Sequence, residues 1–182
     1  MKKDKKNNSA DHLAYLNEDD RAYGLAGMAV SVAALDAFDS IVEFSLDAEN
    51  QMVSFAGEYY FTGAQTISPK ATWNNLLNNF YLTSTMVISN LMARSLVREK
   101  KNVPESGLKA IHHEMLIEGE EACGLESDEV DEIYDRAFKR MNRIFSNPRI
   151  HPAIDDLARV FARRRTLSGR EIFEELRILQ IL

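Results

Sequence analysis

Acidic side chains recur at helical spacing in the first third of the chain. Four of them follow one another at steps of three and four residues: Asp36, Asp39, Glu43 and Asp47. On a helix this spacing puts the carboxylates on one stripe, and metal-binding helical bundles use carboxylates in this way, usually with a Glu-x-x-His pair. The sequence contains no such pair, and the stripe lies opposite the apolar face, so we expect a solvated surface. Only Asp39, which borders Leu35 and Leu46, is expected to be partly buried.

A second group of acids lies in the middle of the chain. It contains two pairs at a spacing of three, Glu118-x-x-Glu121 and Glu132-x-x-Asp135. The spacing resembles the Glu-x-x-Glu and Glu-x-x-Asp motifs of the all-α nucleoside triphosphate pyrophosphohydrolases. Over these eighteen or so residues the resemblance implies a hydrolase whose acids hold magnesium on adjacent helices and activate water against a phosphate. However, Glu132 and Asp135 lie on the polar side of their helix, four residues before Arg136 and Lys139, as exposed ion pairs do.

His112 falls within an apolar helical face, and Glu118 and Cys123 lie close to that face. Buried charge must be paired or coordinated, so we expect these side chains to find partners in the fold. Imidazole, carboxylate and thiolate are all metal ligands. His112 and Glu118 are separated by about 9 Å of helical rise, so one ion could join them only with help from another helix. The candidate metal ligands of the chain are therefore Asp39, Glu43, His112, Glu118 and Glu121.

The C-terminal part of the chain is basic. Residues 136–149 hold five Arg or Lys and no acid, and Arg163, Arg164 and Arg165 follow in a predicted turn between helices. A DNA-binding helix-turn-helix is one interpretation. The second helix of that pair would read the DNA, yet it carries Glu171, Glu174 and Glu175, which repel phosphate. Nucleic acid is therefore an unlikely partner.

Length and composition describe an ordinary globular protein. The chain has 182 residues, 45% hydrophobic residues, a net charge of -6 and one cysteine. The negative charge disfavours nucleic acid or anionic membrane as main partners, and a lone cysteine suits a reducing compartment. The uncharged run of residues 22–35 is too short to span a bilayer, so it is expected to be a buried core or subunit-interface helix. We see no secretory signal, phosphate loop or hydrolase elbow, and we expect a cytoplasmic protein.

Hydrophobic periodicity and caps predict an all-α bundle of about five to six helices. A long helix is expected from Asn17 to about Asp47, and a second from Pro69, capped by Ser68, to about Glu99. A helical hairpin follows: one helix opens at Pro104 and ends near Gly124, and the next, capped by Ser127, reaches Phe145. Within the hairpin, Gly119 is expected to let a neighbouring helix approach closely.

The C-terminal pair of helices follows Pro148 and Pro152, and its last helix begins with a capping box in Leu167–Ile172. Residues 50–62 allow either a small hairpin or a short helix. We favour the helix, because an isolated hairpin is marginally stable. No strand is expected elsewhere.

The domain organisation follows from these elements. We expect residues 1–16 to be a disordered polar tail, 17–146 the bundle core, and 147–182 a helical pair packed on the same domain. Charge is segregated, because residues 102–135 hold eleven acids with Lys109 as the only base, while residues 136–149 are basic. Such asymmetry suits docking between complementary patches. We therefore predict a non-enzymatic cytoplasmic interaction or scaffold protein without a cofactor, which acts as a homodimer or with a protein partner and not on a membrane. The alternatives are a metal-dependent all-α enzyme, possibly pyrophosphohydrolase-like, with a divalent metal, and, third, nucleic-acid binding through the basic C-terminal region.

Overall fold

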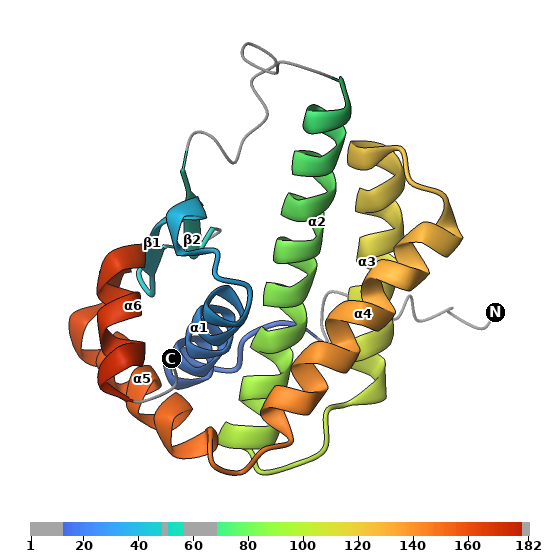
Figure 1. Ribbon diagram of the computed structural model, residues 1–182. Helices are drawn as coiled ribbons and strands as arrows, with labels where there is room; N and C mark the ends of the chain where they lie inside the picture. The colour runs from blue at the N-terminus through green and yellow to red at the C-terminus, as the bar shows by residue number, and fades with distance from the viewer. Residues whose placement is uncertain (1–12, 49–50, 57–68, 180–182) are drawn as a thin grey trace, which may run out of the picture.

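The computed structural model describes residues 13–48, 51–56 and 69–179. Most of this part is helical, with six helices and one small three-stranded sheet, which confirms the predicted helical bundle (Figure 1). The elements run in the order α1 (Glu18–Ala34), η2 (Phe38–Ser40), β1 (Ile41–Ser45), β2 (Val53–Phe55), α2 (Pro69–Met92), η3 (Ala93–Arg98), α3 (Glu105–Cys123), α4 (Ser127–Phe145), α5 (His151–Arg164), β3 (Thr166–Ser168) and α6 (Gly169–Ile178).

Helices α1 and α2 are the central pair, and small residues on α1 bring them together. A Cβ atom added to Gly24 would lie 2.5 Å from the Asn90 side chain, and one added to Gly27 would lie 2.7 Å from the Cβ of Ala93. Real Cβ atoms do not approach other atoms this closely, so only glycine permits this helix spacing. The uncharged run is therefore a core helix, packed on α2 and α5, and its glycines are used within the fold.

The long first helix was predicted to continue to Asp47, and this prediction is wrong. Helix α1 ends at Ala34, and Asp36 has a φ of 51°, which interrupts the helix because that conformation is left-handed. The chain then passes through η2 into β1. The segment Ile41–Ser45 consists largely of β-branched and aromatic residues, which favour a strand. Asp36, Asp39, Glu43 and Asp47 therefore do not share a helical stripe.

Strand β1 lies in the middle of an antiparallel sheet with the order β2-β1-β3. Glu43 is opposite Ser54 of β2 and Ser168 of β3. The favoured helix is wrong for residues 53–55, which form the strand β2 and pair with β1. The hairpin alternative needs a second strand from residues 57–62, which lie outside the described part. The prediction of no strand elsewhere is also wrong. Packing explains why the β1–β2 pair is stable: β3 pairs with the other edge of β1, and α6 packs on β1, with Gly169 close to the carbonyls of Phe38 and Ile41.

The predicted helical hairpin is α3 and α4, which lie side by side in Figure 1. Gly124 ends α3 in the left-handed conformation with a φ of 62°, as a C-cap glycine does. Gly119 faces α4, where an added Cβ would lie 2.6 Å from Val130, so the expectation for this glycine is confirmed. The cap of α4 is Glu126 rather than Ser127, with Glu129 completing a capping box.

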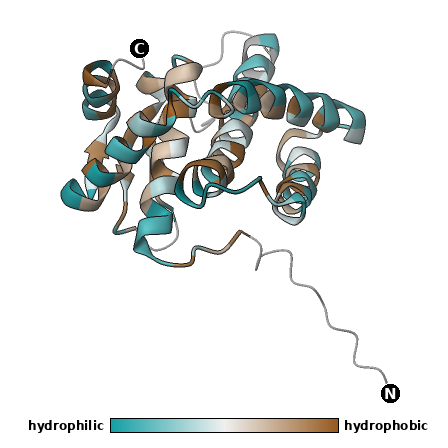
Figure 2. Ribbon diagram, turned by 90° about the horizontal axis from the view of Figure 1, so that it is seen from below, coloured by the Kyte–Doolittle hydropathy of each residue, from teal (hydrophilic) through white to brown (hydrophobic). Residues whose placement is uncertain are grey.

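Two further predictions concern the ends of helices. Helix α2 continues past Met92 as the π-helix η3, so the predicted end near Glu99 is confirmed. The capping box of the last helix is also confirmed: the Glu171 N–H donates to Ser168 Oγ at 3.2 Å, and the Ser168 N–H donates to Glu171 Oε2 at 2.8 Å. Figure 2 shows polar and apolar positions on different sides of the helices, as expected for elements with one buried face.

Candidate functional site

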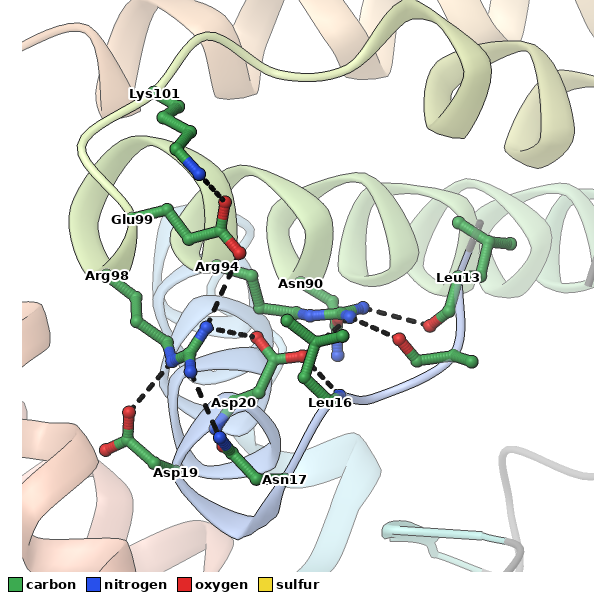
Figure 3. A network of polar contacts seen from close by, with 11 residues as sticks. Leu13, Leu16, Asn17, Asp19, Asp20, Asn90, Arg94, Arg98, Glu99 and Lys101 are labelled. Atoms are coloured by element: carbon green, nitrogen blue, oxygen red, sulfur yellow. Dashed lines mark hydrogen bonds and ion pairs between the residues drawn. The ribbon is translucent and has the colours of Figure 1, made fainter. Parts of the chain in front are cut away.

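The most deeply buried charged group among the described residues is Asp20, in the first turn of α1 (Figure 3). It is 1% exposed. Its carboxylate accepts hydrogen bonds from Arg94 Nη2 at 2.7 Å, Arg98 Nη1 at 3.4 Å and the Leu16 N–H at 3.0 Å. A buried carboxylate needs such compensation, because its desolvation costs several kcal/mol.

Arg94 extends this network to the segment that precedes α1. Its guanidinium donates to the carbonyl of Leu13 at 3.0 Å and to that of Ala14 at 2.7 Å, and it lies 4.6 Å from the centre of the Tyr15 ring. The Tyr15 hydroxyl accepts a 2.7 Å hydrogen bond from Asn90, and burial raises its pKa. Residues 13–16, the end of the predicted tail, are therefore bonded to the central helix pair.

Arg98 completes the network at its solvent edge. It donates to Asp19 at 2.8 Å and to Asn17 at 3.5 Å, so Asp19 balances the second guanidinium. Both arginines lie in η3, and π-helices of this kind often occur at functional positions. Here, however, the carboxylate of Asp20 is occupied by donors from the protein itself. We therefore assign this network to the fold rather than to chemistry.

The sequence did point indirectly to Arg94. Residues 71–93 carry no charge at all, and Arg94 is the first charge that follows, between the apolar residues Leu91 and Val97. A cation that lies among apolar residues at helical spacing needs a buried acid. Asp20, by contrast, looked like a first-turn residue that serves the helix dipole, and nothing in its spacing marked it as the partner.

The five candidate metal ligands do not come together. Asp39 lies in η2 and Glu43 in β1, whereas the remaining three lie on α3, namely His112, Glu118 and Glu121. Asp39 is exposed rather than partly buried, and Glu118 and Glu121 are exposed too. Across residues 13–48, 51–56 and 69–179, no group of three or more His, Cys, Asp or Glu side chains is arranged to hold one metal ion.

His112 has a partner that the sequence did not reveal. Its Nε2 lies 2.7 Å from Asp131 Oδ1, and its ring centroid lies 4.7 Å from that of Tyr134. Together with Glu132 and Asp135, these residues line an acidic hollow of about 420 Å³ beside α4. His112 lies on α3 and Asp131 on α4, and the packing of these two antiparallel helices brings the side chains together. The spacing of residues within either helix does not indicate this pair.

Cys123 and the basic turn are also accounted for. Burial, with a contribution from Glu118, raises the pKa of the Cys123 thiol, which disfavours a nucleophilic role. Arg165 pairs with Glu18 at 2.6 Å and Asp47 at 2.5 Å, and Arg164 pairs with Glu171. Two of the three turn arginines thus have acidic partners within the chain.

Helix α4 carries the clearest pattern of exposed charge. The side opposite its buried residues presents, in order, Asp128, Glu132, Asp135, Lys139 and Arg143, all exposed. We call this set the α4 stripe. It is acidic in its first half and basic in its second half. Asp135 and Lys139 pair with each other at 2.9 Å, with side chains 62% and 74% exposed, so most of their surface remains free for a partner.

A helix long and apolar enough to cross a bilayer is not found in the described part of the chain. Comparisons with protein families, curated proteins and solved structures find nothing that matches this chain.

Proposed function

We propose that this protein is a non-enzymatic cytoplasmic interaction protein that works as a homodimer, and that α4 is its self-association face. The observation that carries the proposal is the reversal of charge at the middle of the α4 stripe. A surface that is acidic at one end and basic at the other complements a second copy of itself when that copy is turned by 180°. Two-fold dimers use such self-complementary patches, in which residue i meets residue j and j meets i.

The arrangement of the stripe defines the contact. If two α4 helices pack antiparallel through this stripe, with the two-fold axis midway between Asp135 and Lys139, Asp135 of each copy lies opposite the partner's Lys139. The acidic first half then faces the partner's basic second half on both sides of the axis. The intramolecular pairs of Asp135 and Lys139, one in each copy, are exposed and exchange for two intermolecular pairs with little loss of free energy.

The energetics favour a weak and salt-sensitive dimer. Exposed ion pairs contribute only about 0.2–1 kcal/mol each, so they set the orientation and the association rate more than the affinity. Apolar burial comes from the aliphatic stems of Lys139 and Arg143, which reach toward the partner's acidic hollow beside Tyr134. We expect a weak dimer whose dissociation constant rises as the salt concentration is raised.

Sedimentation equilibrium of the full chain tests this proposal. We expect dimers at about 50 mM salt and progressive dissociation toward about 500 mM, because salt screens exposed charges. Lys139→Glu should abolish the dimer, since it places two carboxylates opposite each other. Lys109→Glu, at an exposed lysine on α3 outside the stripe, is the matched control and should leave the dimer intact. A chain that stays monomeric at about 100 μM and low salt contradicts the proposal.

A further inference from the structure

A second hollow lies between the C-terminal ends of α1 and α4, beside the segment through which α4 leads into α5. Its volume is about 410 Å³, within the range of small-molecule sites. Eight residues line it: Val30, Ala33, Ala34, Arg140, Arg143, Ile144, Asn147 and Ile150. We call it the basic hollow. Five of these side chains are aliphatic, and none of the eight is acidic.

The charged groups of the basic hollow attract anions. Arg140 donates to the carbonyl of Ala34, which covers the negative end of α1 and leaves further N–H donors on the guanidinium. Arg143 is exposed and has no acidic partner among the described residues. Two cations therefore border the hollow, where they offset the partial negative charge of the C-terminal ends of α1 and α4.

Helix α5 adds a third attraction from the far side. It begins at His151, whose N–H donates to the Pro148 carbonyl at 3.4 Å, and its N-cap residue Ile150 lines the hollow. The N-terminus of a helix carries a partial positive charge, which attracts anions. The positive end of α5 thus lies on the same hollow as the two guanidinium groups.

The aliphatic residues of the basic hollow indicate which kind of anion it binds. An inorganic ion would use the arginines and leave Val30, Ile144 and Ile150 without a function, whereas a neutral hydrocarbon would leave the arginines unused. We propose that the basic hollow binds a small amphipathic carboxylate, with its carboxylate group on Arg143 and Arg140 and its short aliphatic body against Val30, Ala33 and Ile144. Arg143 also belongs to the α4 stripe, so the site and the dimer contact share this side chain, but the proposal rests on the hollow and not on the dimer.

Titration of the full chain with octanoate, followed by calorimetry and amide chemical shifts, tests the site. We expect saturable binding of one octanoate per chain, with shifts centred on residues 30–34 and 140–150. Acetate has the charge without the aliphatic body, and 1-octanol has the body without the charge, so each should bind at least about tenfold more weakly. Equal binding of octanoate and octanol would overturn the proposed role of the arginines.

Two substitutions probe the charged and the apolar parts separately. Arg143→Gln removes one charge-assisted hydrogen bond and should weaken octanoate binding about tenfold or more. Arg149→Gln, at an exposed arginine that does not line the hollow, is the matched control and should change binding less than about twofold. Ala33→Leu fills the hollow without altering any charge and should also abolish binding.

The outcomes separate this proposal from the dimer. Sedimentation of the same samples shows whether Arg143→Gln alters self-association; a loss of octanoate binding at unchanged sedimentation supports the site. If Arg143→Gln and Arg149→Gln weaken binding equally, the carboxylate is held by general surface charge and the proposal is wrong. It is equally wrong if folded Ala33→Leu protein, verified by circular dichroism, binds octanoate as the wild type does.

Discussion

Asp20 on α1 and Asp135 on α4 are the same residue type in helices of the same bundle, yet they have opposite environments. Asp20 is 1% exposed and accepts bonds from two arginines and a backbone N–H. The side chain of Asp135 is 62% exposed and has one exposed lysine as its partner. The first carboxylate is fixed by the fold, whereas the second can exchange its partner.

This contrast separates structural charge from charge that is available for binding. Around Asp20, removing one group leaves an uncompensated ion in a low-dielectric region, so the fold depends on each member of the network. Along the α4 stripe, water screens the charged groups, so the stability of the fold should not depend on them. Association with a second copy should depend on them. Substitutions in the two regions should therefore affect different measurements.

The largest effect on stability is expected at the buried network. Asp20→Ala removes the acceptor of Arg94 and leaves that guanidinium buried without its counter-ion, so the free energy of unfolding should fall by about 3–5 kcal/mol. Urea denaturation followed by circular dichroism measures this loss. Asp19→Ala is the matched control, because Asp19 is the adjacent residue and also binds Arg98, but its side chain is 66% exposed. It should lose less than about 1 kcal/mol; equal losses would remove the distinction between the two regions.

The close approach of α1 and α2 should show the next largest effect. Gly27→Ala places a methyl group against the Ser89 carbonyl and the Cβ of Ala93, and overpacking of this kind destabilises a core by about 1–3 kcal/mol. The midpoint of urea unfolding should therefore decrease, although alanine is the better helix former. An unchanged or raised midpoint would contradict this prediction, because it would mean that α1 and α2 can move apart without a loss of stability.

The hydroxyl of Tyr23 should make stability depend on pH, with an effect smaller than that of the buried Asp20 network and larger than that of the exposed α4 stripe. Its hydroxyl donates to Asp155 at 2.8 Å, and burial together with this carboxylate raises the pKa of Tyr23 from 10 to about 12. The folded protein keeps this proton to higher pH than the unfolded chain does. The contribution to stability is therefore complete below pH 10 and is lost as the pH rises toward 12. Absorbance at the tyrosinate band should lose one late-titrating group in Tyr23→Phe; an unchanged titration would contradict the assignment.

The smallest effect on stability is expected on the α4 stripe. Lys139→Gln removes one exposed pair, so the free energy of unfolding of the monomer at high salt should change by less than about 0.5 kcal/mol. The same substitution should weaken self-association at low salt several-fold. Paired denaturation and sedimentation experiments measure both quantities on one sample. A stability loss as large as that of Asp20→Ala would show that the stripe belongs to the fold.

Local signals predicted the helices that begin and end at marked residues. Pro69, Pro104 and Gly124 lie at helix boundaries, and Ser168 with Glu171 forms the expected capping box. These features depend on a few neighbouring residues, so a sequence pattern is sufficient to find them.

The sheet could not be predicted in the same way, because it depends on residues far apart in the chain. Glu43 of β1 pairs with Ser168 of β3, and the acids of residues 36–47 happen to repeat at helical spacing. The pairs of Asp20 with Arg94 and of His112 with Asp131 also join separate helices. Their partners follow from helix packing, which the pattern of one helix does not contain.

Mixing two charge variants of α4 tests the central claim most directly. In Asp135→Lys and in Lys139→Glu, the two-fold contact places like charges opposite each other, so each variant alone should sediment as a monomer at low salt. In the mixture, the lysine introduced into the first variant faces the glutamate introduced into the second. The unchanged Lys139 of the first variant also faces the unchanged Asp135 of the second, so a heterodimer should form. Homodimers of either variant alone, or a mixture that stays monomeric while the wild type dimerises, would contradict the account.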